Sequence, residues 1–145
     1  MTKAILAPAA VLVLWSLVVL VWLAVARFGG VKSVPKEKLR ELPRVGGRGA
    51  DIEKVLPPQA NWVSHNYTHL MEQPTLFYAT VLILAVVGEG TGFNLMLAWA
   101  YTAFRIAHSL WQILSNTIPV RFALFIASTV CLLALSINAI RATAF

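Results

Sequence analysis

The sequence predicts an all-α integral membrane protein, a bundle of four helices that each cross the bilayer. Hydrophobic residues make up 59% of the 145 residues, whereas charged residues make up only 12%. A soluble domain carries roughly twice that share of charged residues, so the composition excludes soluble metalloenzymes and nucleic-acid-binding domains. Four long apolar segments remain, each close to the roughly 20 residues that a helix needs to cross a bilayer.

The first predicted span covers residues 4–27, and no charged residue interrupts it between Lys3 and Arg27. The Ala-Val-Ala tripeptide before Arg27 has the form of a signal-peptide cleavage site. However, the apolar stretch is far longer than the roughly 7–15 residues of a signal-peptide core. We therefore expect a retained transmembrane helix.

The connection after this span, residues 28–65, is long, polar and basic. Seven of the twelve Lys and Arg residues lie within residues 31–64. Basic residues accumulate in the cytoplasmic loops of membrane proteins, so we expect a multi-pass protein of a bacterial inner membrane with this loop in the cytoplasm. Clustered Pro and Gly residues indicate irregular structure, apart from one short amphipathic stretch near residues 36–42.

Three further spans follow, joined by two short links. Pro74 lies in the first turns of the second span, where a proline removes few backbone hydrogen bonds. The Gly-rich link at residues 88–92 carries no Lys or Arg, and we expect it on the non-cytoplasmic side. The spans are predicted at residues 66–88, 93–115 and 120–141.

The third span carries a ridge of polar residues that indicates a functional site. The ridge consists of Asn94, Tyr101, Arg105, His108 and Gln112, at intervals of seven, four, three and four. These are the spacings of one helical face. An arginine at the centre of a membrane helix costs roughly 2.5–3.5 kcal/mol on insertion scales. The ridge is therefore expected to face the protein interior or a wet cavity.

The second span offers a partner for this buried charge. His65, His69 and Glu72 are spaced by four and three residues and share one face. A helix rises about 1.5 Å per residue, which places Glu72 about 24 Å and Arg105 about 18 Å from the 88–92 link. An ion pair between Glu72 and Arg105 is therefore expected. It either locks two helices together or forms part of a functional site.

Arg121 stands in the first turn of the fourth span. Free backbone N–H groups at this position favour anions. The side chain either extends to the membrane surface or completes a cytoplasm-facing anion site with Arg105 and His108. No metal site is expected, because the single cysteine lies in an apolar run.

Several of these segments resemble the MAPEG family, the membrane-associated proteins of eicosanoid and glutathione metabolism. They are LMEQPTLFY at residues 70–78, AWAYTAFRIAHS at residues 98–109, and PVRF at residues 119–122 with Asn116 before it. The similarity covers most of the chain. It implies a homotrimer of four-helix subunits that binds glutathione as co-substrate in cytoplasm-facing sites between neighbouring subunits.

The resemblance also implies roles for individual residues. Glu72 is similar in position to the residue that meets the amino end of glutathione, and Arg105 with His108 corresponds to a third-helix Arg-x-x-His pair. Arg121 corresponds to the arginine that helps to stabilise the thiolate, which is the catalytic role. Arg27 is placed like a basic residue that ends the first helix and contributes to binding.

The chain differs from the glutathione-using members at three positions. His69 stands where those members carry Asn, and it is included with the binding residues. His65 lies in the upstream stretch where they carry Arg, and Gln112 takes the place of a Tyr. Because histidine is neutral for much of the time near pH 7, these positions would hold a dianionic tripeptide less firmly.

Two functions follow from these observations. The first is a membrane-bound glutathione transferase or peroxidase that acts on lipophilic electrophiles arriving from membrane lipid, with Arg121 raising the thiolate content. The second is a non-catalytic accessory or lipid-binding subunit that keeps the trimer and has lost glutathione binding. A minor alternative is haem ligation by His69 and His108.

Overall fold

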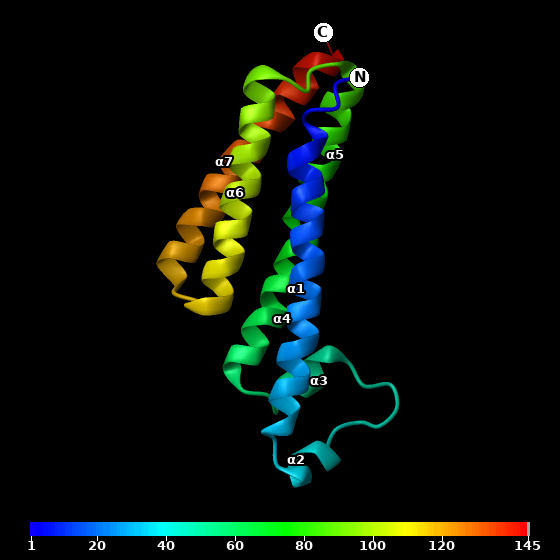
Figure 1. The fold of residues 1–145 in the computed structure, drawn as a ribbon, viewed down its shortest axis with the longest axis vertical. Helices are drawn as coiled ribbons and strands as arrows, with labels where there is room; N and C mark the ends of the chain where they lie inside the picture. Colours follow the sequence, from blue (N-terminus) through cyan, green and yellow to red (C-terminus); the bar gives the residue numbers. More distant parts are fainter. Residues whose placement is uncertain (145) are drawn as a thin grey trace.

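The computed structural model describes residues 1–144, which form seven helices (Figure 1). Two short helices lie in the loop after the first span, α2 (Lys36–Arg40) and α3 (Gly49–Glu53). Both described chain ends lie at one end of the molecule, and α2 and α3 lie at the other (Figure 1). The long helices are α1 (Leu6–Lys32), α4 (Pro58–Met71), α5 (Gln73–Val87), α6 (Gly92–Leu114) and α7 (Ile118–Ala144).

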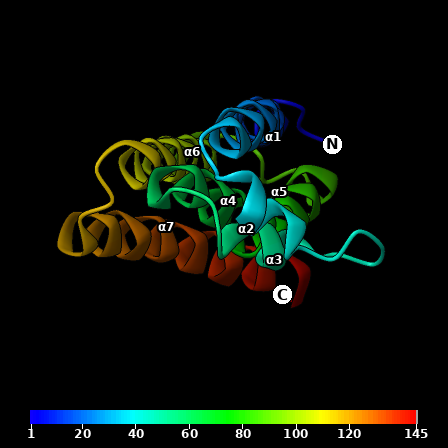
Figure 2. The same cartoon turned by 90° about the horizontal axis from the view of Figure 1, so that it is seen from below.

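The long helices pack side by side, with α1 and α7 on opposite sides of the molecule (Figure 2). Helix α1 packs against α4, α5 and α6, whereas α7 packs against α5 and α6. The core between them is apolar, and the rings of Phe77 and Tyr101 stack with their centroids 4.2 Å apart. Large apolar side chains also cover the outer faces of α1 and α7, as expected for helices surrounded by lipid.

Three segments are long and apolar enough to cross a membrane, judged by length and composition: Leu6–Lys32, Pro58–Val87 and Ile118–Ala144. Helix α6 has 23 residues, but its polar ridge lowers its hydropathy. The five ridge residues are each at most 8% exposed. The prediction that the ridge faces the protein interior is therefore confirmed.

The second predicted span consists of two helices. Helix α4 begins at residue 58 rather than 66, and the break falls at Glu72, where φ is −87° and ψ is −96°. Pro74 explains the break, because it has no N–H for the carbonyl of Leu70 and its ring crowds that carbonyl. The last turn of α4 is thereby left with carbonyl groups that have no donor within the helix.

The first helix continues to Lys32, past its predicted end at residue 27. The loop explains this extension, because Leu56 and Ala60 pack against the added turns. A Cβ atom at Gly30 would come within 2.9 Å of Leu56 Cδ2. Helix α3 was not predicted, since the sequence indicated an irregular chain there.

Gly90 permits a close approach between the α5–α6 link and the start of the chain. Its amide donates a hydrogen bond to Thr2 Oγ1 at 2.8 Å, and an added Cβ would lie 2.7 Å from Ile5 Cγ2.

We expect Gly90→Ala to lower the free energy of unfolding by about 1–3 kcal/mol, measured by unfolding in mixed micelles. Gly29→Ala is the control, because no atom lies within 4 Å of its added Cβ. Equal destabilisation in both variants would contradict this account.

Candidate functional site

Arg105 is the centre of the candidate site. It lies in the middle of α6 and is 2% exposed. Its Nη2 donates a hydrogen bond of 2.6 Å to the carbonyl oxygen of His69. That carbonyl belongs to the last turn of α4, where the break before Pro74 leaves it without a donor from its own helix. The broken helix thus supplies the first partner of the buried guanidinium.

The predicted ion pair between Glu72 and Arg105 is wrong. Among the ion pairs formed within residues 1–144, none involves Arg105. Glu72 instead lies 3.3 Å from Nδ1 of His69, and 60% of its side chain is exposed. The depth estimate gave the height of Glu72 along the helix, but not the direction of its side chain, which changes at the helix break.

Several buried polar atoms of the α6 ridge have no hydrogen-bond partner within residues 1–144. They are Nε and Nη1 of Arg105, Nε2 of His108 and Oε1 of Gln112. Buried polar groups in folded proteins almost always have a partner, and a buried charge without one is strongly destabilising. We infer that these groups are satisfied from outside this part of the chain, by a ligand, by water or by a neighbouring copy.

A cavity of about 210 Å³ adjoins one of these residues, His108. It is lined by His69, His108, Arg121 and the apolar Ile118, Phe122 and Phe125. The rings of His69 and His108 have their centroids 6.1 Å apart. Arg121 Nη1 donates a hydrogen bond of 2.6 Å to Asn116 Oδ1, which directs the guanidinium. The cavity therefore has a cationic side and an aromatic side, a combination that suits an anionic group joined to an apolar one.

A larger cavity, of about 430 Å³, lies at the opposite end of α7 beside Glu89 and Arg141. Of the ridge residues only Asn94 lines it, and none of the residues predicted to bind glutathione or to catalyse does. Size alone is therefore a poor guide here, and the buried unpartnered groups identify the smaller cavity as the candidate site.

Comparison with known proteins identifies the family of this chain. The sequence pattern that defines the MAPEG family matches residues 5–141, nearly the whole chain. The chain belongs to the MAPEG family. The predicted resemblance is thus confirmed, and family membership together with the three apolar spans makes this an integral membrane protein. No curated protein and no solved structure matches the chain.

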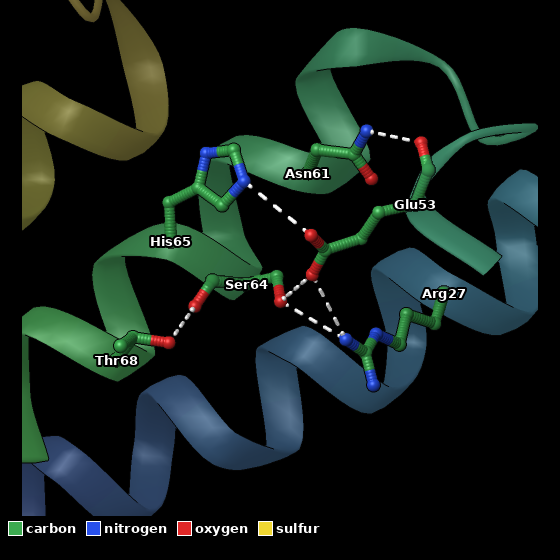
Figure 3. A network of polar contacts seen from close by, with 6 residues as sticks. All are labelled: Arg27, Glu53, Asn61, Ser64, His65 and Thr68. Atoms are coloured by element: carbon green, nitrogen blue, oxygen red, sulfur yellow. Dashed lines mark hydrogen bonds and ion pairs between the residues drawn. The ribbon is translucent and has the colours of Figure 1, made fainter. Parts of the chain in front are cut away.

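Arg27 does not line the His69 cavity of this MAPEG chain. Its Nη2 lies 3.2 Å from Glu53 Oε1 and 2.9 Å from Ser64 Oγ. His65 Nε2 lies 3.5 Å from the other carboxylate oxygen of Glu53. Figure 3 shows these side chains converging from α1, α3 and α4. Arg27 therefore helps to anchor the loop helix α3 to the bundle.

A junction of three helices beside the site was missed by sequence reasoning. Ser109 Oγ accepts hydrogen bonds from Trp15 Nε1 at 2.9 Å and from Asn66 Nδ2 at 2.7 Å. Ser109 follows His108 directly, so the junction fixes this turn of α6 against α1 and α4. The signal available in the sequence was weak, since it consisted of single polar residues in apolar segments.

The carboxylate of Glu53 is held ionised by its surroundings. Burial raises its pKa, but the Ser64 hydrogen bond and the charges of His65 and Arg27 together lower the pKa below the usual 4.5. A carboxyl group with a lowered pKa stabilises the folded state above the pKa of the unfolded state. This stability is lost as the pH falls through the lowered value.

We expect the docking of α3 to weaken as the pH falls below about 4.5, the usual pKa of the group. Amide hydrogen exchange of residues 49–56, compared between the native chain and Glu53→Gln at each pH, measures this change. The native chain should lose protection on acidification, whereas Glu53→Gln should be weakly protected throughout. Glu37→Gln, at an exposed position in α2, is the matched control. Identical pH profiles for the native chain and Glu53→Gln would rule out this role.

Proposed function

We propose that this protein is a membrane-bound glutathione transferase or peroxidase that acts on lipophilic electrophiles. The observation that carries the proposal is the buried Arg105 guanidinium, whose Nε and Nη1 have no partner within residues 1–144. A buried arginine with unused N–H groups is suited to bind a carboxylate through charge-assisted hydrogen bonds. Glutathione is an anionic tripeptide with two carboxylates, and it is the co-substrate that the family resemblance implies.

The residues around the cavity take complementary roles in this proposal. Arg105 and His108 bind a carboxylate of the tripeptide, and the exposed Glu72 meets its amino end. Arg121 lies beside the sulfur, where a guanidinium lowers the pKa of a thiol and raises its thiolate content. His69 lines the cavity together with His108 and Arg121. Arg27 has no part in the proposed site, because its hydrogen bonds to Glu53 and Ser64 place it beside a different cavity.

The reaction begins when the thiol of glutathione loses its proton to water. The thiolate sulfur then attacks an electrophilic carbon, and the carbon–sulfur bond forms while the bond to the leaving group breaks and its electron pair departs. With a lipid hydroperoxide, two glutathione thiols become one disulfide while the hydroperoxide is reduced to an alcohol and water. The aromatic side of the cavity, with Phe122 and Phe125, receives the lipophilic partner from the bilayer.

The proposal includes a homotrimer, which the family resemblance implies. Sites between neighbouring subunits would also supply partners for buried groups that remain unsatisfied within one chain. Gln112, whose Oε1 is buried without a partner in residues 1–144, is one such group.

The alternative function is a non-catalytic subunit that holds lipid in the same cavity. The contact between Glu72 and His69 favours it, because this contact engages the carboxylate that would otherwise meet the tripeptide. The two functions differ in whether glutathione binds at all.

Equilibrium binding of glutathione to the purified protein tests the proposal. We expect binding by the native chain and at least tenfold weaker binding by Arg105→Gln, the loss that about 1.4 kcal/mol represents. Arg121→Gln should bind glutathione but give less thiolate absorbance, because its effect falls on the sulfur. Arg141→Gln, which lies outside this cavity, should match the native chain.

Two results would contradict the proposal. One is absence of binding at millimolar glutathione, which would favour the lipid-holding alternative. The other is unchanged affinity in Arg105→Gln, provided that its elution volume in detergent matches the native chain and so shows that it is folded.

A further inference from the structure

A third cavity lies on the outer face of α1 and shares no lining residue with the His69 cavity. It has a volume of about 360 Å³, within the roughly 300–1,000 Å³ that small-molecule sites occupy. We call it the α1 groove. Its lining includes Leu20, Leu23, Ala24, Phe28 and Arg27 of α1, with Ile52 of α3.

The α1 groove is apolar except for Arg27, which keeps part of its guanidinium free. The hydrogen bonds that Arg27 forms within residues 1–144 all come from Nη2, to Glu53 and Ser64. Its Nε is buried without a partner in the same part of the chain, and 31% of the side chain is exposed. Nη1 is therefore available to an anionic group at the loop end of the groove.

The contacts of Glu53 set the shape of the groove. Glu53 joins α3 to Arg27 on α1 and to Ser64 and His65 on α4 (Figure 3). Ile52, the preceding residue, is thereby held against α1 and forms one wall. Because Glu53 contacts Nη2, an anion at Nη1 would not have to displace it.

The surroundings of the groove favour a negatively charged amphiphile. Residues 28–65 contain seven Lys and Arg residues and four Asp and Glu residues, so their net charge is 7 − 4 = +3. Basic segments next to a membrane attract anionic lipid headgroups. The groove also opens sideways, since Phe28 is 74% exposed and Leu20 is 40% exposed. Its apolar part lies on a segment that is long and apolar enough to cross the bilayer.

We propose that the α1 groove binds one acyl chain of an anionic phospholipid from the surrounding bilayer, with the phosphate at Nη1 of Arg27. The acyl chain lies along Leu20, Leu23 and Ala24, and Ile52 covers the end of the chain that is nearest to the loop. The lipid thereby joins the membrane-spanning part of α1 to the cytoplasmic loop. This proposal does not depend on glutathione.

Native mass spectrometry of the purified full-length protein tests the proposal. Phosphatidylglycerol or phosphatidylcholine of equal chain length is added, and the lipid that stays bound is counted. We expect one phosphatidylglycerol to be retained in preference to phosphatidylcholine. Ala24→Phe, which fills the groove, should weaken retention about tenfold. Val21→Phe adds the same side chain at an α1 position outside the groove that is 64% exposed, and it should retain lipid like the native chain.

A second variant separates the headgroup from the acyl chain. In Arg27→Gln, the ratio of retained phosphatidylglycerol to retained phosphatidylcholine should fall close to one. Equal retention by Ala24→Phe and Val21→Phe would mean that only the general lipid shell is present, and it would overturn the proposal. So would an unchanged headgroup preference in Arg27→Gln, or a cross-link showing that a second copy of the chain covers the groove.

Discussion

The buried positive charge of Arg105 is the constraint on which the arrangement of the site depends. A guanidinium inside a membrane helix needs hydrogen-bond acceptors, because the surrounding lipid supplies none. The chain provides one, the carbonyl of His69. The two other nitrogens of the group are buried and have no partner within residues 1–144. A ligand, water or a neighbouring copy of the chain has to supply the missing acceptors, and the proposed binding of glutathione is one way of supplying them.

The helix break at Glu72 connects the local sequence to this site. Pro74 ends α4 early, so the carbonyl of His69 is released to accept from Arg105 instead of from its own helix. The same break turns the Glu72 side chain outward to the edge of the site. Trp15 and Asn66 then fix the neighbouring turn of α6 through Ser109. Pro74 thus explains two features of the site: Arg105 donates to the carbonyl of His69, and it forms no ion pair with Glu72.

The sequence was sufficient for the features that depend on periodicity and composition. The spacing of the α6 ridge predicted that Arg105 and His108 face inward, and their burial confirms it. The partner of Arg105 could not be predicted in this way, because residue spacing gives the face and height of a side chain only along an unbroken helix. Helix α3 escaped prediction for another reason. It has five residues, and it is held in place by contacts from Glu53 to residues on α1 and α4.

The most direct test of the central claim is the stability of Arg105→Met, measured by unfolding in detergent without added glutathione. If the charge is incompletely neutralised within the protein, an apolar side chain of similar length should leave the free energy of unfolding unchanged or raise it. A loss of about 3–5 kcal/mol, the usual result of breaking a well-paired buried charge, would show that the protein already neutralises Arg105 by itself and would contradict the account.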